Sequence, residues 1–340
     1  MGDAILATSL LNTLRCNFPD AQIHFVLNER IAPLFVGHPS IDRCITFTDE
    51  ECHSTFTYLR KVWRVVHAVH YDAIIDMRST LNTMPFSLFS RSTKYRIGVD
   101  KGYTKIAYSH TIPTCGDKYS MVEYNTLYAQ PLQELHPIEP VYDFSLPVTE
   151  QERQSCAAYL TAQGVDLSRP VMLANVTAKL ASKEWMEDRT LWVFNRFLEH
   201  YHDYQIIFNY PPGREEEKVR RIYEKMGRPH QVFIDVQSHS LRELVAMVSY
   251  MTVFFGNEGG ARHIAQAVGC PTLAICAPEN SKHVWIPQTT VLAEGISPLD
   301  TLSLHHLTEQ AYHQLTREEK YSLLTQEYVW QRLQTFIGKL

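Results

Sequence analysis

Residues 254–278 read F-F-G-N-E-G-G-A-R-H-I-A-Q-A-V-G-C-P-T-L-A-I-C-A-P. The pattern predicts the end of a strand, a tight glycine turn, a helix that begins on that turn, and a second strand. Such a turn aims backbone N–H groups and the positive end of a helix dipole at one point, which is how proteins bind phosphate. Glu258 and His263 flank that point. The stretch therefore predicts an anion-binding site in the second half of the chain.

The composition of the whole chain is that of an ordinary globular protein. Its 340 residues suffice for two domains, and 45% of them are hydrophobic and 20% charged. With a net charge of −5, the chain has no excess of basic residues that would attract nucleic acid, so no nucleic-acid partner is expected. The seven cysteines form no C-x-x-C pair, which favours reduced thiols and no zinc site. Without a signal peptide or a long apolar run, the sequence predicts a cytoplasmic protein.

Strand and helix patterns alternate on both sides of a proline-containing stretch at 136–147. Before it we expect helices over 3–16, 29–37 and 56–69, and strands over 23–27, 44–47 and 72–77. After it we expect strands over 171–176, 204–209, 232–235, 251–256 and 272–276, and helices over 189–201, 214–226, 240–249 and 260–268. This alternation indicates parallel βαβ units. It predicts an N-terminal domain over 1–145, a C-terminal domain over 150–300, and a helical segment over 301–340 that packs back across the domains.

The start of the N-terminal domain departs from the usual pattern. The chain opens with Met-Gly-Asp and then a helix, whereas a doubly wound domain ordinarily begins with a strand that feeds such a turn. We therefore expect either that the first strand of this domain is absent or that the sequence begins late because of the choice of start codon. A missing central strand would leave a groove in the sheet.

Two polar segments could carry chemistry at the ends of elements. Asp3 begins the first helix, either as a plain N-terminal acid or as a carboxylate facing a cleft. The loop 175–186, N-V-T-A-K-L-A-S-K-E-W-M, leaves a strand with hydroxyls and lysines that suit phosphate oxygens, although a solvated loop has the same composition. It is not a P-loop, because G-x-x-x-x-G-K-[ST] occurs nowhere.

Two further segments lie at strand-to-helix junctions of the second domain. The turn G-N-E-G-G is not G-x-G-x-x-G, so a nicotinamide site is disfavoured, and its glycines could simply serve strand–helix packing. The segment P-P-G-R-E-E-E at 211–217 could offer a carboxylate to a ribose diol, or could be a solvated helix start. Together, the three junctions of this domain predict a nucleotide site at one edge of its sheet.

Taken in order, these segments resemble glycosyltransferase family 9, the ADP-heptose:lipopolysaccharide heptosyltransferases, over nearly the whole chain. The opening G-D-A-I-L-A-T-S-L-L resembles the family's G-D-x-x-x-x-x-P-x-L start, and residues 76–98 resemble its acceptor-domain segment. T-A-K-L-A-S-K-E-W-M resembles the K-x-W-P element. G-N-E-G-G-A-R-H-I-A-Q-A resembles the N-D-S-G-x-x-H-x-A-A signature, which is the most specific of the four.

The resemblance implies an α/β protein of the GT-B fold, with two Rossmann-like parallel-sheet domains facing a central cleft. It implies an inverting glycosyltransferase that moves a sugar, heptose from ADP-heptose, onto a lipopolysaccharide core or related glycolipid. The partners are then a nucleotide-sugar donor and a lipid-linked saccharide acceptor, with no metal cofactor. The acceptor would bring the protein into peripheral contact with the cytoplasmic face of the inner membrane.

The resemblance also assigns roles by position. Asp3 matches the general base and Lys183 the lysine on the donor diphosphate. Asp76 and Arg78 fall in the acceptor-binding segment. The remaining matches are donor-binding residues: Thr177 and Lys179 near the phosphates, Glu217 at the ribose, His239 at the adenine, and Glu258, Gly259, Gly260 and His263 in the pyrophosphate turn.

The chain departs from the family at the turn, where Glu258 replaces an Asp and Arg262 adds a cation that we expect to meet an acidic sugar or a phosphorylated acceptor. Two other functions fit the same architecture. One is a nucleotide-sugar epimerase, which would need several further acids and bases in the cleft. The other is a non-catalytic protein that binds sugar nucleotides, which the absent first strand makes plausible.

Overall fold

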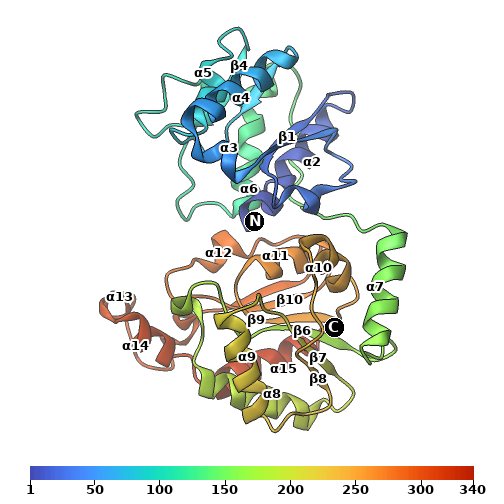
Figure 1. Ribbon diagram of the computed structural model, residues 1–340. Coiled ribbons are helices and arrows are strands. Elements are labelled where there is room, and N and C mark those ends of the chain that lie inside the picture. Colours follow the sequence, from blue (N-terminus) through green and yellow to red (C-terminus); the bar gives the residue numbers. More distant parts are fainter. The chain divides into compact units, whose positions relative to one another are not determined.

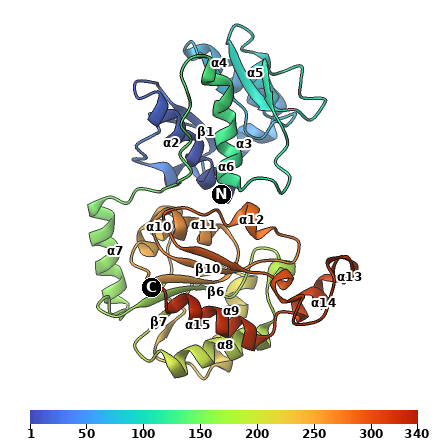
Figure 2. The same cartoon turned by 180° about the vertical axis from the view of Figure 1, so that it is seen from behind.

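The computed structural model describes residues 1–340, which form two compact α/β units (Figures 1 and 2). The N-unit contains Met1 and Asp3–Phe144, and the C-unit contains Gly2 and Ser145–Leu340. All paired strands in both units are parallel. The model therefore has the parallel α/β construction that the alternating sequence pattern predicts.

The five strands of the N-unit form two separate sheets. One has the order β1-β2 and the other β3-β4-β5. The strands are β1 (His24–Asn28), β2 (Arg43–Phe47), β3 (Ala73–Ile75), β4 (Tyr95–Val99) and β5 (His110–Ile112). The helices are α1 (Gly2–Leu6), α2 (Thr8–Asn17), α3 (Asp49–His53), α4 (Thr55–Ala68), α5 (Met84–Leu88) and α6 (Met121–Thr126), with 3-10 helices η1 (Ala32–Phe35) and η2 (Leu127–Glu134).

Helices cover both sheets of the N-unit. α2 contributes Leu10 to a cluster with Ile97 and Val99 of β4 and with Tyr128 of η2. α4 begins at the N-cap Ser54, whose hydroxyl accepts from the Thr57 N–H, and it buries a stripe that includes Val62 and Val66. That stripe packs on Phe47 and on partly buried residues of β2 and β3.

The C-unit holds one six-stranded sheet of order β11-β10-β9-β6-β7-β8. The chain runs outward from β6 to one side and returns to lay β9 on the other side of it, so β6 and β9 flank the topological switch point. Both central strands are almost wholly buried. The strands are β6 (Val171–Asn175), β7 (Gln205–Phe208), β8 (Val232–Phe233), β9 (Val253–Asn257), β10 (Thr272–Ile275) and β11 (Ala293–Ile296).

Helices pack on this sheet and carry the chain between its strands. They are α7 (Glu150–Ala162), α8 (Glu187–His200), α9 (Arg214–Lys225), α10 (Leu241–Val248), α11 (Gly260–Ala267) and α12 (Lys282–Trp285), with 3-10 helices η3 (Ala181–Lys183) and η4 (Pro298–Thr301). The C-terminal segment adds α13 (Glu309–Gln314), α14 (Arg317–Ser322) and α15 (Gln326–Ile337). α15 packs beside α8, and its Leu333 and Phe336 join Phe197 in the core of the C-unit.

Two expected helices of the N-unit differ from the structure. The predicted helix over 29–37 is wrong, since only the short η1 forms there, with Pro33 in its first turn. The predicted helix over 3–16 is divided into α1 and α2. At the division, the Thr8 and Ser9 hydroxyls donate to the carbonyls of Ile5 and Leu6.

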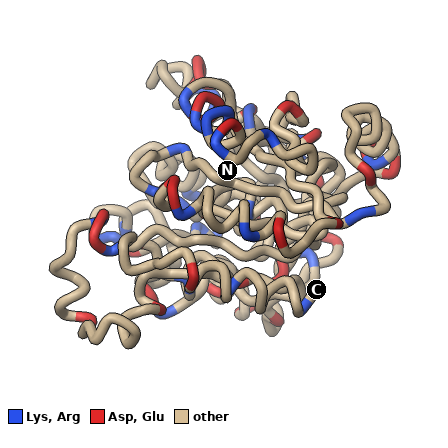
Figure 3. Tube along the Cα trace, turned by 90° about the horizontal axis from the view of Figure 1, so that it is seen from below, with Lys and Arg blue, Asp and Glu red and all other residues tan.

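Charged residues of both signs occur along the whole chain. Basic and acidic residues are interspersed along the trace (Figure 3). On α4, the helix that carries Arg60, Lys61 and Arg64, the Lys61 ammonium pairs with Glu51. None of the helices is both long enough and apolar enough to cross a membrane.

Candidate functional site

The carboxyl ends of three neighbouring strands of the C-unit carry a layer of asparagines. Asn175 ends β6 and Asn257 ends β9, while Asn209 follows β7. The Asn209 amide donates to the Asn175 Oδ1 over 3.0 Å, and the Asn257 Oδ1 accepts from the Trp185 N–H over 2.9 Å. These bonds fix the loop after β6 against the loop after β9. The two loops that the sequence singled out thus meet at the switch point, where open α/β sheets bind ligands.

A glycine makes the close approach of β6 and β9 possible. Gly256 has φ +134°, and a Cβ at this position would lie 2.2 Å from the Asn175 carbonyl oxygen. No other residue fits there, because both the backbone conformation and the space exclude a side chain. Gly259 is different, since its φ of 168° is extended backbone and nothing lies within 4 Å of its Cβ position.

The amino end of α11 is left without a side-chain cap. Its N-cap residue is Gly259, and no side chain accepts a hydrogen bond from the N–H groups of its first turn. By contrast, α10 is capped by Ser240 and α12 by Ser281. An uncapped helix end with glycine at its start presents backbone N–H donors and the positive end of the helix dipole to an anion.

Lys183 and Glu258 meet beside this helix end. The Lys183 Nζ lies 3.3 Å from the Glu258 Oε1, and the Asn280 amide donates to the same carboxylate. The Lys183 side chain stays 37% exposed, whereas that of Glu258 is 11% exposed. Burial raises the pKa of Glu258, although Lys183 and Asn280 counteract this. The carboxylate therefore holds an accessible ammonium group next to the α11 turn.

His263, one turn into α11, is buried and is held by its neighbour. The Arg262 Nη2 donates to the His263 Nδ1 over 2.7 Å. Because a guanidinium can only donate, Nδ1 must be the unprotonated nitrogen and Nε2 carries the hydrogen. Burial, and then the charge of Arg262, hold the pKa of His263 well below its ordinary value. His263 is thus a neutral imidazole that offers one N–H donor at Nε2.

Arg262, which we expected to meet an acidic sugar or a phosphorylated acceptor, is instead buried in the interior of the C-unit. The side chain is 1% exposed. Its Nη1 donates to the Gln266 Oε1 over 2.8 Å, and its Nη2 also donates to the Trp285 carbonyl over 2.7 Å. Burial lowers its pKa to about 10, and no carboxylate forms an ion pair with it. Arg262 is a buried cation that ties α11 to α12.

The loop after β6 is tied to the start of α9. The Thr177 hydroxyl donates to the Glu215 Oε2 over 2.8 Å, so Glu215 and not Glu217 reaches this loop. Glu184 accepts from the Ala178 N–H and pairs with Arg214 and Lys218.

The predicted donor residues of this loop and of α9 differ in their exposure to solvent. Thr177 is buried within the loop, whereas Lys179 and Glu217 are both exposed to solvent. Lys183 and Glu258 meet beside the α11 turn, and Thr177 joins the same loop to Glu215.

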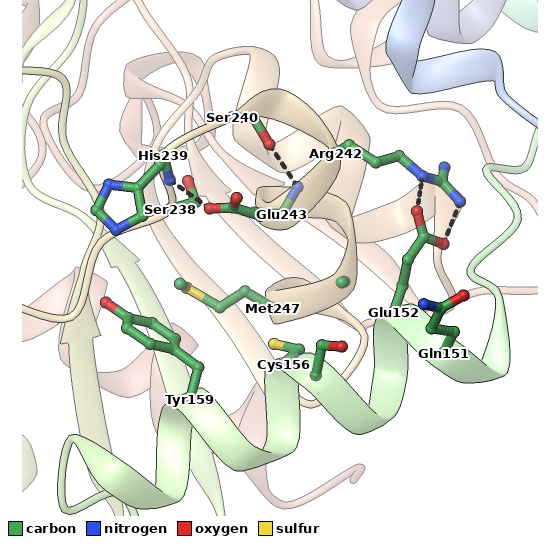
Figure 4. A pocket seen from close by; sticks show the side chains of 12 residues that line it. Gln151, Glu152, Cys156, Tyr159, Ser238, His239, Ser240, Arg242, Glu243 and Met247 are labelled. Atoms are coloured by element: carbon green, nitrogen blue, oxygen red, sulfur yellow. Dashed lines mark hydrogen bonds and ion pairs between the residues drawn. The ribbon is translucent and has the colours of Figure 1, made fainter.

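His239 lies at a separate open pocket of about 510 Å³ between α7 and α10 (Figure 4). Its ring forms an edge contact with Tyr159 at 6.4 Å between centroids. The Glu152 carboxylate pairs with Arg242 on the other side of the pocket, with 2.6 Å between Nη2 and Oε2. This pairing lowers the pKa of Glu152 to about 2. Neither Lys183 nor Glu258 lines this pocket.

The predicted residues of the N-unit have different environments. Asp3 lies in the first turn of α1 and is exposed. Asp76 follows β3 and is 7% exposed. Its carboxylate accepts hydrogen bonds from the Ser79 N–H over 2.9 Å and from the Tyr108 hydroxyl over 2.6 Å. Arg78 is exposed two residues further on. Asp76 thus holds a turn, and Arg78 is the group of this pair that solvent can reach.

Several residues of the site were missed in the sequence. Asn280 lies in no motif, Glu215 lies in the quoted segment 211–217 but was not chosen from its three glutamates, and Glu184 belongs to the loop 175–186 without a role of its own. In the sequence, Glu184 and Trp185 directly follow Lys183. This order does not show that the Glu184 side chain turns toward α9. The seven cysteines are all free, and no group of three His, Cys, Asp or Glu side chains is arranged to hold a metal ion.

Comparison with known proteins places this arrangement in a family. The family description "Glycosyltransferase family 9 (heptosyltransferase)" matches residues 59–321. Lipopolysaccharide heptosyltransferase 3 of Escherichia coli K12 is 21% identical over 333 residues, which cover 94% of this chain and 90% of that protein.

Two solved structures share the fold. The family 9 glycosyltransferase of Veillonella parvula superposes with a TM-score of 0.83 at 18% identity, covering 100% of this chain and 94% of that one. The ADP-heptose lipopolysaccharide heptosyltransferase II of Escherichia coli superposes with a TM-score of 0.73 at 17% identity, covering 99% and 96%. These matches confirm the predicted GT-B fold. With a family description that spans most of its length, the chain belongs to glycosyltransferase family 9 and is a glycosyltransferase.

Proposed function

We propose that the protein transfers heptose from ADP-heptose to a lipopolysaccharide core or related glycolipid, with inversion at the anomeric carbon. The observation that carries this proposal is the Lys183 ammonium, held 3.3 Å from Glu258 beside the uncapped start of α11. Two relatives that it resembles are named as heptosyltransferases, one of them for ADP-heptose.

The C-unit is suited to stabilise a departing diphosphate. As the bond between the sugar and the diphosphate breaks, negative charge builds on the leaving oxygens and the sugar becomes cation-like. Three groups of donors would stabilise this negative charge from fixed positions. They are the Lys183 ammonium, the first N–H groups of α11 and the Nε2–H of His263. His239 and the pocket beside it offer an aromatic edge for the adenine.

Asp3 is the proposed base that accepts the proton of the acceptor hydroxyl. It is a carboxylate exposed at the start of α1, so it is free to approach a substrate. Arg78 is the proposed contact for the acceptor saccharide or its phosphates, because it stays exposed while Asp76 is occupied by Ser79 and Tyr108.

The test separates binding from turnover. Calorimetry with ADP, UDP and GDP should show ADP binding most tightly, and Lys183→Met should weaken ADP binding at least about tenfold. Asp3→Asn should leave the Kd for ADP unchanged while lowering kcat with ADP-heptose and a lipid-linked acceptor about 100- to 10,000-fold. Equal affinity for the three nucleotides would contradict the donor assignment. ADP binding without any turnover by the unmodified chain would instead indicate a binding protein.

A further inference from the structure

A tyrosine hydroxyl in the interior of the C-unit has no hydrogen-bond partner. Tyr321 lies on α14 and is 5% exposed. Its ring belongs to the large apolar cluster of the C-unit, together with Trp185 and Ile275. Its hydroxyl is shielded from solvent and neither donates nor accepts a hydrogen bond. Because a buried polar group without a partner is destabilising, it calls for a physical reason, such as a partner that another arrangement of the nearby side chains supplies.

Two carboxylates act on this hydroxyl. Burial raises the pKa of Tyr321 most, and the charges of Glu258 and Glu279 raise it further. Glu279 is 43% exposed and already accepts from the Arg317 Nε over 2.8 Å. Glu258 is 11% exposed, and its N–H donates to the carbonyl of Ile275, which shares the apolar cluster with Tyr321. Of the two, Glu258 is the buried carboxylate, and a buried carboxylate depends on donors within the protein.

The donors that hold Glu258 use only one of its two oxygens. The Lys183 ammonium and the Asn280 amide both donate to Oε1, and Oε2 accepts from neither of them. A diphosphate carries more negative charge than one carboxylate, so the Lys183 ammonium would turn toward it. Glu258 would then remain charged in the interior with the Asn280 amide as its partner. Removing one member of a buried ion pair in this way is costly unless another donor takes its place.

The segment that carries Tyr321 is attached to the loop after β6. The Trp185 Nε1 of that loop donates to the Leu324 carbonyl over 3.3 Å. The Arg189 Nη1, at the start of α8, donates to the Ser322 carbonyl over 2.9 Å. These bonds lie on both sides of Tyr321 in the sequence, so its hydroxyl keeps a fixed position relative to the loop that bears the lysine.

The same segment is attached to the loop after β10, which carries Asn280. The Tyr312 hydroxyl of α13 donates to the Pro278 carbonyl over 3.1 Å. The Arg317 guanidinium of α14 pairs with Glu279 in the same loop. α13 and α14 thus join the two loops whose side chains hold the Glu258 carboxylate.

We propose that Tyr321 is a positioning residue for the donor diphosphate. When the Lys183 ammonium turns to the diphosphate, the Tyr321 hydroxyl donates to the Glu258 Oε2 and holds that carboxylate beside the α11 turn. Tyr321 touches no substrate and acts through Glu258, because it lowers the cost of releasing Lys183. The inference rests on the proposed binding of a diphosphate by Lys183.

The experiment uses Tyr321→Phe, which removes the hydroxyl and keeps the ring. While Lys183 holds Glu258 the hydroxyl has no partner, so urea unfolding without ADP should show an unchanged or raised midpoint. Calorimetry should show the Kd for ADP rising at least about tenfold, because a hydrogen bond to a charged group is lost. The matched control is Tyr250→Phe. The Tyr250 hydroxyl donates to the Arg153 carbonyl over 2.9 Å, and Tyr250 precedes β9, at the opposite end of that strand from Glu258. This control should lower the midpoint and leave the Kd for ADP unchanged.

A second background tests whether Tyr321 acts through Glu258. Glu258→Met leaves no carboxylate for the hydroxyl, so adding Tyr321→Phe to it should not change the Kd for ADP further. Equal weakening with and without the carboxylate would overturn the proposal, because the hydroxyl would then act on another group. A lowered midpoint with an unchanged Kd for ADP would also overturn it and show a purely structural role. Failure of the unmodified chain to bind ADP would overturn the proposed function and this inference together, whereas ADP binding that Tyr321→Phe leaves intact would overturn this inference alone.

Discussion

Acidification should destabilise the C-unit through one buried side chain, His263. Its folded pKa lies well below the ordinary 6.5, because burial and the adjacent Arg262 guanidinium both disfavour the imidazolium. As the pH falls, the unfolded chain therefore binds this proton first. The contribution of His263 to stability is fully present above the unfolded pKa of 6.5 and is lost progressively below it.

The size of the effect follows from the unfolded pKa alone. A group that stays unprotonated in the folded state and has an unfolded pKa of 6.5 contributes about 1.4 kcal/mol less at about pH 5.5 than at about pH 7.5. His263→Gln removes the titration. The free energy of unfolding of the unmodified chain should thus fall by about 1.4 kcal/mol more than that of the variant over this interval.

Urea unfolding at the two pH values, followed by tryptophan fluorescence, measures this difference. Four of the five tryptophans lie in the C-unit, so the signal mainly reports the unit that contains His263. The comparison between variants cancels the titration of the other 15 histidines, which the two chains share. A loss of stability that is equal in both chains would refute the assignment of His263 as a buried neutral imidazole.

Three further substitutions test other contacts. Glu258→Gln removes the negative charge that competes with a diphosphate for Lys183, so calorimetry should show the Kd for ADP falling up to about tenfold, and weaker binding would contradict this account. Gly256→Ala should lower the free energy of unfolding in urea by about 3 kcal/mol, because its Cβ meets the Asn175 carbonyl; an unchanged midpoint would disprove the required close approach. Asp76→Asn should cost about 1–3 kcal/mol in the same assay without altering the Kd for ADP, and an effect on ADP alone would show that Asp76 belongs to a ligand site.

The sequence was most informative where local signals determine structure. The strand, glycine turn and helix from residue 253 to 267 were predicted almost to the residue, because an apolar run, a glycine cluster and a second apolar periodicity follow one another. It was least informative about which face of each helix turns toward the interior. Arg262 and Gln266 are four positions apart on α11, a spacing that permits a contact, but the sequence does not show that this face of the helix turns inward.

The sequence also does not show which of several neighbouring residues of the same type makes a given contact. The three glutamates 215–217 carry the same chemistry, and the resemblance favoured Glu217 as the ribose acid. The structure brings Glu215 to Thr177, because Gly213 begins α9 and sets which residue of the first turn faces the loop after β6. A shift of one or two positions along a helix turns a side chain to another face, which spacing alone does not fix.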